Sequence, residues 1–452
     1  MEWLNLALAL LLPVFTGAAC IGLLIAPHTP ARAAIVWGNG ALLGLFLTPL
    51  VMRLQDAVGL PLSFSVTATG LGILLLILLV FLQLRARSPA VSAGFVAPRM
   101  SLSPAQKTLF LLFAMLIGLR VLSLGMELVW RPLYGWDATM HWATKARVWF
   151  SAGSLVPFVE NQQWLEMGGK GVSTDHHPAY PITVPLLQVW MSLALGRWDE
   201  SLINLPWLLC LVGLGSAFYG QSRFAGATPV VSIAFTYLLL SMPLLNTHVA
   251  LAGYADLFMG AAYCLAIMAF YNWSVTRAPG QGLLALLFIF CCLLAKNEGF
   301  YWALTFLPAL LVVTLPHRHT IVLFCAASLM LVSLLIVIPQ DVEVAGHSLQ
   351  QLDLHYRPNA LWAIAVSLWV QDNWHLFAYL LLALSLLSMV SARTVPRQYL
   401  GVITALVAAI GLLLVLFTFT HFANGALRFT AIGRISLHLV PGLLFLCLLL
   451  WN

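Results

Sequence analysis

Apolar runs of membrane-spanning length recur from one end of this chain to the other. About 20 apolar helical residues cross the hydrocarbon core of a bilayer, and windows of that length follow one another with no hydrophilic stretch between them long enough to fold as a separate soluble domain. Only 8% of the 452 residues are charged and 62% are hydrophobic, too little polar material to solvate a water-facing surface. The sequence therefore predicts an all-α, polytopic integral membrane protein.

The apolar windows predict about thirteen transmembrane helices. They fall near residues 3–25, 33–52, 66–84, 107–129, 201–219, 229–247, 255–274, 281–296, 299–316, 320–338, 373–391, 398–420 and 434–451. The stretches 181–196 and 360–370 are short and rich in Trp and Pro. We expect them to form helices that lie at the membrane interface or re-enter it.

The distribution of charge supports this arrangement. With the N-terminus outside, the short inner loops carry only basic residues, and all 15 Asp and Glu residues face outward. The basic residues are scattered singly rather than clustered on one face, which argues against nucleic acid as a partner. We expect a multi-pass protein of the inner (cytoplasmic) membrane whose polar chemistry faces the periplasm or the cell exterior.

The longest hydrophilic stretch, residues 130–180, places a carboxylate among aromatic residues just after a span. Asp137 follows Trp136 and precedes His141. A carboxylate partly shielded from water can orient an acceptor hydroxyl or take its proton. The alternative is a helix N-cap within an interfacial belt of Trp residues.

Several motifs follow this loop in an order that resembles the GT-C superfamily of glycosyltransferases, with protein O-mannosyltransferases and bacterial aminoarabinose transferases as the nearest look-alikes. These motifs are His177-Pro178-Ala179-Tyr180-Pro181, Gly196-Arg197-Trp198-Asp199-Glu200, Gly253-Tyr254-Ala255-Asp256 and Ala295-Lys296-Asn297-Glu298-Gly299. The resemblance covers roughly residues 107–320 and, weakly, the last span. It departs from the family at the three N-terminal spans, and at Asp137, which lacks the adjacent acid that the family often carries.

The resemblance implies a GT-C-like architecture in which the outer first catalytic loop contains juxtamembrane helices. It divides the chain into extra N-terminal helices (1–106), a catalytic core (107–339) with the outer loop 130–200, and C-terminal helices (340–452). It implies transfer of a sugar, with inversion, from a polyprenyl-phosphate donor to an acceptor hydroxyl. The bilayer and the lipid-linked sugar are then the expected partners, and the acceptor is unknown.

The resemblance also implies roles for individual residues. Asp137 and Asp256 are the expected catalytic carboxylates, although Asp256 could instead cap its helix. Fixed cations stabilise the charge that develops on a departing phosphate, and the candidates are Lys296, Arg428, Arg434 and His438; the alternative for the two arginines is snorkelling to lipid headgroups. The expected substrate contacts are Trp136, His141, His177, Tyr180 and Glu298.

A metal site, a transporter and a polymerase or ligase are the alternatives for these residues. Asp175, His176 and His177 offer groups that suit a divalent ion, but three consecutive residues do not easily converge on one metal, so we expect neither a metal nor a cofactor. A transporter or flippase of lipid-linked saccharides is the main alternative, and it predicts polar groups near mid-membrane, often in duplicated halves. The chain has no internal repeat and almost no charge within its spans, which favours the enzyme. A polysaccharide polymerase or ligase would carry its large outer loop late in the chain rather than early.

Overall fold

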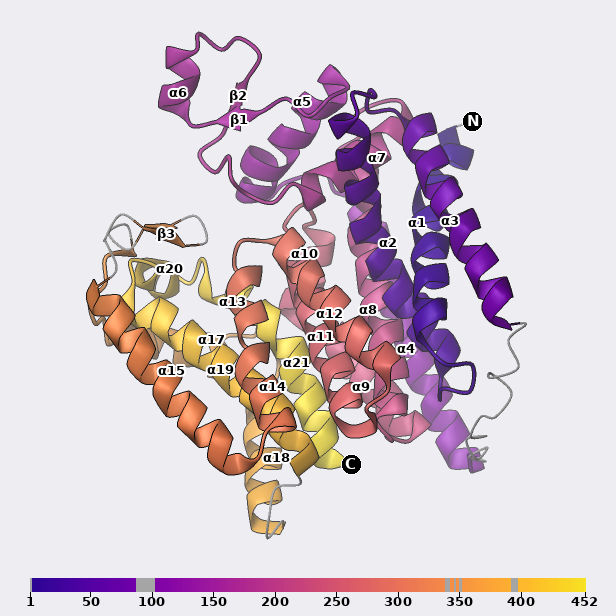
Figure 1. Ribbon diagram of the computed structural model, residues 1–452. Helices are drawn as coiled ribbons and strands as arrows, with labels where there is room; N and C mark the ends of the chain where they lie inside the picture. Colours follow the sequence, from indigo (N-terminus) through magenta and orange to yellow (C-terminus); the bar gives the residue numbers. More distant parts are fainter. Residues whose placement is uncertain (1, 87–101, 338–341, 345–346, 349–351, 392–396) are drawn as a thin grey trace.

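The computed structural model describes residues 2–86, 102–337, 342–344, 347–348, 352–391 and 397–452 and is built almost entirely of helices (Figure 1). The α-helices are α1 (Glu2–Leu24), α2 (Arg32–Ala57), α3 (Phe64–Ala86), α4 (Pro104–Trp130), α5 (Thr144–Ala152), α6 (Asn161–Glu166), α7 (Thr183–Leu195), α8 (Leu205–Phe224), α9 (Pro229–Leu240), α10 (Pro243–Ala250), α11 (Asp256–Thr276), α12 (Pro279–Ala295), α13 (Gly299–Leu304), α14 (Phe306–Thr314), α15 (His317–Val337), α17 (Asn359–Trp369), α18 (Phe377–Ser391), α19 (Arg397–Phe419), α20 (Ala423–Leu427) and α21 (Ile432–Trp451). A π-helical turn, η2 (Ala138–Ala143), precedes α5, and a 3-10 turn, η3 (Leu202–Asn204), precedes α8. Strand β1 (Phe158–Val159) pairs in parallel with β2 (Ser173–Thr174), and β3 (Glu343–Val344) pairs antiparallel with β4 (His347–Ser348). The predicted all-α class is confirmed.

Some of these helices are long enough to cross a membrane. Within the described residues, 8 helices are long and apolar enough to cross a membrane, or 9 if α9 and α10, which meet at an angle of 60°, form one span. The predicted spans 281–296, 299–316 and 373–391 fall on apolar helices of 10–17 residues, which are shorter than this criterion requires. The structure therefore supports a polytopic membrane protein without showing thirteen crossings.

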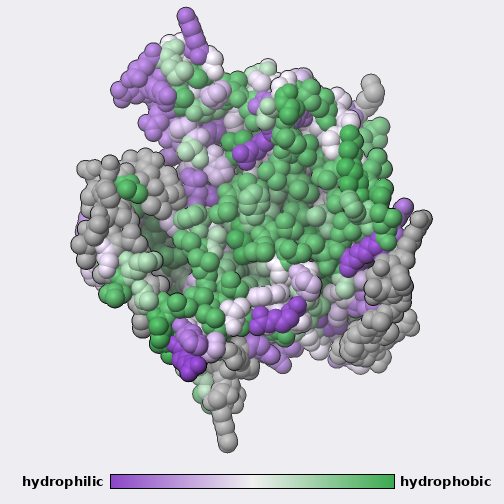
Figure 2. Space-filling model, viewed as in Figure 1, coloured by the Kyte–Doolittle hydropathy of each residue, from purple (hydrophilic) through white to green (hydrophobic). Residues whose placement is uncertain are grey.

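The helices form a buried centre and an apolar periphery. The most apolar window of α21 is 89% buried inside the molecule, whereas that of α4 is only 6% buried. An apolar helix exposed along its length is stable against lipid and not against water. Figure 2 shows the corresponding apolar surface across the middle of one face, with hydrophilic residues gathered above and below it.

The N-terminal helices share this centre. Phe46 on α2 packs edge-on against Phe258 on α11, with ring centroids 6.3 Å apart, and Trp207 on α8 meets the same ring at 5.2 Å. Ile21 on α1 belongs to the same buried cluster. Helices α1 and α2 are thus packed into the common core, beside helices α8 and α11.

Helices α5 and α6 and strands β1 and β2 lie over one end of the helical bundle (Figure 1), and several carboxylates lie at this end. Asp56, at the end of α2, accepts a hydrogen bond from the backbone N–H of Leu155 at 2.9 Å. Arg197 pairs with Glu2 at 3.2 Å, and Arg147 pairs with Glu200 at 2.5 Å. Acidic residues that the sequence assigned to one side of the membrane therefore meet at one end. The helices expected at 181–196 and 360–370 are α7 and α17.

Candidate functional site

Asp256 lies at the centre of a buried ionic network. It is the first residue of α11 and is fully buried. Its Oδ1 accepts from Lys296 Nζ and His438 Nε2, both at 3.0 Å, and its Oδ2 faces Arg434 Nη2 at 3.0 Å and Nε at 3.1 Å. A buried carboxylate is strongly destabilising unless charged or polar donors surround it. Lys296, Arg434 and His438 are these donors. The side chain of Asp256 makes no capping hydrogen bond to its own helix.

Close packing of α21 against α11 brings two of these donors within reach. Arg434 and His438 are four residues apart and therefore lie on the same face of α21. Gly260 lies one turn beyond Asp256, and a Cβ there would come within 2.6 Å of the Leu437 carbonyl oxygen. Glycine at this position lets the two backbones approach closely enough for both side chains to reach one carboxylate.

Asp137 connects the network to the surface. Arg434 Nη1 donates to Asp137 Oδ2, so one guanidinium bridges two carboxylates. The ring of Tyr254 lies 4.7 Å from the same guanidinium and adds a cation–π contact. The side chains of Asp137 and Arg434 are 32% and 26% exposed. The carboxylate of Asp137 makes no N-cap hydrogen bond, so the capping alternative is not the role that the structure gives it.

The meeting of Asp137 and Asp256 on one arginine depends on a close backbone crossing. Gly253 adopts φ +105°, a left-handed conformation that glycine adopts without steric penalty. A Cβ at Gly253 would lie 2.6 Å from the Cβ of Ala138, the first residue of η2. The segment before α11 therefore lies directly against the turn that carries Asp137.

The network carries more negative than positive charge. Lys296 also pairs with Glu298 at 3.0 Å, which gives three carboxylates against two cations. Trp302 Nε1 donates to His438 Nδ1 at 3.1 Å, so the proton of this imidazole sits on Nε2, which donates to Asp256, and the ring is neutral. A phosphate reaches Lys296 or Arg434 only by competing with carboxylates that already hold them.

A second cluster of charges lies in the loop above the network. Asp175 Oδ1 meets His141 Nδ1 at 2.6 Å, and Asp175 Oδ2 meets Lys145 Nζ at 2.7 Å. Lys145 also donates to the His177 carbonyl at 2.6 Å, and both Lys145 and Asp175 are buried. Burial alone would raise the pKa of Asp175, but the hydrogen bonds from Lys145 and His141 hold it below its usual value. This carboxylate is therefore ionised near neutral pH.

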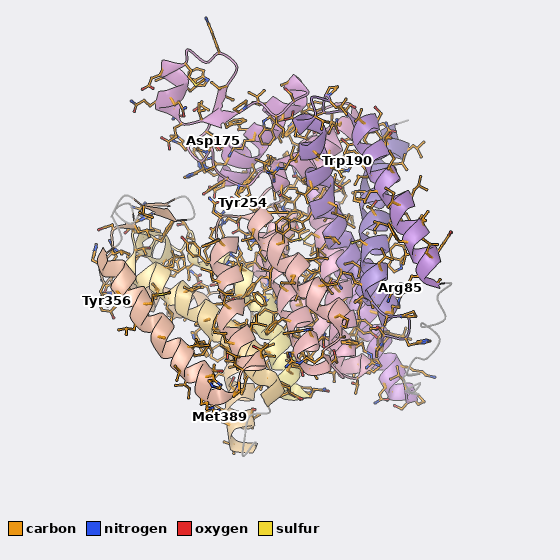
Figure 3. The ribbon with its side chains drawn as sticks, in the orientation of Figure 1. Arg85, Asp175, Trp190, Tyr254, Tyr356 and Met389 are labelled. Carbon is orange, nitrogen blue, oxygen red and sulfur yellow. The ribbon has the colours of Figure 1, made fainter. Side chains whose placement is uncertain are left out.

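Aromatic rings join the two clusters into one site. Tyr180 is stacked between Trp142, at 5.2 Å, and His177, at 4.6 Å. Burial raises the pKa of Tyr180 to about 12, and the nearby charges of Lys296, Glu298, Arg434 and Asp137 also act on its hydroxyl. Thr183, at the start of α7, donates to the Leu294 carbonyl at 2.7 Å, close to the end of α12. Figure 3 shows the labelled Asp175 and Tyr254 at the same end of the molecule.

Most of the residues nominated from the sequence converge here. The ionic network contains Asp137, Asp256, Lys296, Glu298, Arg434 and His438, and the loop cluster contains His141, His177 and Tyr180. Trp136 is 70% exposed, and Arg428 is exposed at the end of α20. No contact recorded among the described residues joins either side chain to the network, and their roles stay predictions.

The structure adds Lys145 and Trp302, which the sequence did not nominate, and it gives a new role to Asp175, which the sequence suggested only as a metal ligand. Lys145 and Asp175 form the buried pair of the loop, and Trp302 fixes the tautomer of His438. The only signal for Lys145 was its position four residues after His141, on the same helical face. Nothing in the sequence linked Trp302 to a histidine 136 positions away.

The carboxylates and imidazoles of this region are groups that could ligate a metal ion. Across the part of the chain that the structure describes, no group of three or more His, Cys, Asp or Glu residues is arranged to hold a metal ion. Asp175 is instead engaged by His141 and Lys145.

Comparison with known proteins supplies no further assignment. No protein-family model, no curated protein and no solved structure matches this chain.

Proposed function

We propose that this protein is a membrane glycosyltransferase of the GT-C type, which moves a sugar from a polyprenyl-phosphate donor to an acceptor hydroxyl with inversion at the anomeric carbon. The observation that carries the proposal is the chain of contacts from the part-exposed Asp137 through Arg434 to the buried Asp256, with Lys296 and His438 beyond it. This chain lies at the start of α11 and α21, where an interfacial substrate would meet the bundle.

A lipid-phosphate donor suits this location. Its polyprenyl tail dissolves in the bilayer and its phosphate stays at the interface, beside the ends of the helices. Cleavage of the sugar–phosphate bond leaves negative charge on the phosphate, which preorganised cations stabilise in a site shielded from water. Arg434 and Lys296 are those cations in this proposal. Each is bound by two carboxylates, and one of these ion pairs is exchanged for a contact with the phosphate when the donor binds.

Asp137 meets the acceptor in this proposal. It is the most exposed carboxylate of the network, and Arg434 holds one of its oxygens. The other oxygen is available to accept a hydrogen bond from an acceptor hydroxyl and to aim it at the anomeric carbon, while the phosphate departs from the opposite face of the sugar. Holding the reactants in line supplies much of the rate enhancement of such reactions.

The proposed topology places this end of the molecule at the periplasm or cell exterior and the chain in the inner membrane. About thirteen crossings follow if α9 with α10, α12, α13 with α14, α15 and α18 each complete a span alongside the longer helices. Helices α5, α6 and α7 are then the juxtamembrane helices of the outer catalytic loop. The extra N-terminal helices support the loop, since Asp56 on α2 binds its backbone.

The test is the fate of the sugar–phosphate bond. Purified protein in proteoliposomes is given polyprenyl-phosphate hexoses and pentoses, with methyl glycosides and a serine peptide as acceptors, and free polyprenyl phosphate is measured. We expect release that Asp256→Asn abolishes and that Asp353→Asn, at an exposed ion pair away from the network, leaves unchanged. Movement of intact donor across the bilayer without release would overturn the proposal in favour of a flippase.

A further inference from the structure

Two imidazoles in this site are held by carboxylates, and their surroundings differ. His438 is fully buried, its Nδ1 accepts from Trp302, and its Nε2 donates to Asp256. Both nitrogens are occupied, so His438 cannot exchange a proton with a substrate without breaking one of these bonds.

His141 has one nitrogen free. Its Nδ1 faces the ionised Asp175 at 2.6 Å, so Nδ1 carries the proton and Nε2 keeps its lone pair. Among the described residues, no recorded hydrogen bond or ion pair involves Nε2. The His141 side chain is 11% exposed. An imidazole oriented by a carboxylate, with its second nitrogen accessible, is the arrangement that lets histidine act as a general base.

Asp175 is itself fixed. Lys145 holds its second oxygen at 2.7 Å, and both side chains are buried in a loop outside the transmembrane helices. A buried ion pair contributes little to stability compared with apolar residues of the same size. Its geometry instead holds the carboxylate in one orientation toward His141.

His141 lies beside the proposed acceptor position. It follows Asp137 by four residues on η2, a wide helical turn on which residues four or five apart share a face. Its ring contacts His177 at 4.9 Å and Tyr180 at 6.2 Å, and Tyr180 lies within the field of the ionic network. Asp137, by contrast, has one carboxylate oxygen bound to Arg434, and this fixed position suits it to orient a hydroxyl.

We propose that His141 is the general base that deprotonates the acceptor, with Asp175 and Lys145 as positioning residues; this rests on the glycosyl transfer proposed above. The acceptor oxygen forms a bond to the anomeric carbon while the bond from that carbon to the phosphate oxygen breaks, and the electron pair leaves with the polyprenyl phosphate. The hydroxyl proton moves to His141 Nε2. The resulting imidazolium is balanced by Asp175 and returns its proton to solvent.

Two variants test this assignment by different routes. His141→Gln keeps an amide donor for Asp175 but provides no base, and His141→Ala opens a space that added imidazole can enter. We expect kcat for polyprenyl-phosphate release to fall about 100- to 10,000-fold in both, with little change in the KM for donor. Added imidazole should restore part of the activity of His141→Ala and none of that of Asp175→Asn, in which His141 still fills its place.

His176→Ala is the matched control, because it removes an exposed imidazole from the same loop and should leave kcat unchanged. Wild-type kcat in His141→Gln would overturn the assignment of His141 and leave the proposed transfer standing. Loss of activity in His141→Ala that imidazole does not restore would assign His141 a structural role and also overturn it. Absence of polyprenyl-phosphate release by the wild-type protein with every donor would instead overturn the proposed function itself.

Discussion

Asp256 collects three basic side chains that lie 40, 178 and 182 positions away in the sequence. Breaking a buried ion pair from one side leaves uncompensated charge and typically costs about 3–5 kcal/mol, whereas an exposed pair contributes about 1 kcal/mol or less. The buried Asp256 and the part-exposed Asp137 both pair with Arg434. Substituting each in turn therefore compares the loss of a buried ion pair with the loss of an exposed one.

Asp256→Asn should therefore lower thermal stability much more than Asp137→Asn. The first variant leaves Lys296 and Arg434 facing a neutral amide in the buried centre. The second removes a charge from a side chain that is 32% exposed, where water can solvate Arg434. The measurement is the melting temperature of both purified variants in the same detergent. Equal melting temperatures would show that Asp256 is not the carboxylate on which the network depends.

Lys296→Met should raise the apparent KM for a polyprenyl-phosphate sugar without preventing insertion into the membrane. Methionine fills a similar volume, and Asp256 keeps Arg434 and His438 as partners, so the main loss is a cation for the donor phosphate. Initial rates across a range of donor concentrations give the result, with Lys170→Met, at an exposed lysine of the loop, as the control. Unchanged kinetics would reduce Lys296 to a structural ion pair.

The residues of the network could be predicted in part because charge at the end of an apolar span has few structural uses. That argument found Asp137, Asp256, Lys296 and Arg434 but could not show which of them would pair. Lys145 and Asp175 stand among other polar loop residues, and burial is what distinguishes them. Sequence spacing carries no information on burial within an irregular loop.

At the level of helices, the approach of α21 to α11 sets the site. Gly260→Ala introduces a methyl group 2.6 Å from the Leu437 carbonyl oxygen, and the two helices must separate. Overpacking of this kind costs about 1–3 kcal/mol, and Arg434 and His438 would move away from Asp256. We expect a lower melting temperature together with reduced polyprenyl-phosphate release.

The matched control is Gly118→Ala on α4, where a Cβ meets no atom within 4 Å. Alanine favours a helix over glycine, so this variant should be at least as stable as the wild type and equally active. Wild-type activity and stability in Gly260→Ala would show that close packing of α11 and α21 does not position the site.

Helix boundaries followed the hydropathy closely where no proline intervened. The predicted span 255–274 corresponds to α11 (Asp256–Thr276). The predicted span 229–247 is divided into α9 and α10, because Pro243 cannot donate to the Leu239 carbonyl and holds Met242 extended. The predicted span 299–316 is divided into α13 and α14, and Pro308 withdraws the donor for Leu304 in the same way. Hydropathy windows count apolar residues and are insensitive to a single missing N–H group.

Over the whole molecule, the sequence predicted the class correctly and did not predict how the parts share one core. The N-terminal helices looked separate because the resemblance began after them, yet α2 packs against both α8 and α11. Contacts between distant spans depend on the shapes of interlocking side chains, which a hydropathy pattern does not contain. The position of Glu2, Asp56 and Glu200 at one end agrees with the predicted alternation of loops, whereas Asp341 lies outside the described residues.

The proposed orientation predicts the outcome of cysteine labelling in intact cells. Cysteine at Ser154, exposed in the outer loop, should react with an impermeant maleimide, and cysteine at Ala105, at the opposite end of α4, should react only after permeabilisation. The wild-type chain is the blank, since its described cysteines are buried or part-buried. Labelling of position 105 but not 154 in intact cells would invert the topology.

Asp137→Asn tests the central claim most directly, with transfer and stability measured on one preparation. Asparagine has nearly the volume of aspartate and can still accept a hydrogen bond from Arg434. It lacks the negative charge that, in this proposal, binds and orients the acceptor hydroxyl. Expression and melting temperature should stay near those of the wild type, while polyprenyl-phosphate release should fall by about 100-fold, the size of loss that a misplaced reactant causes. Near-normal release by a stable Asp137→Asn protein would contradict the account of this network as the site of glycosyl transfer.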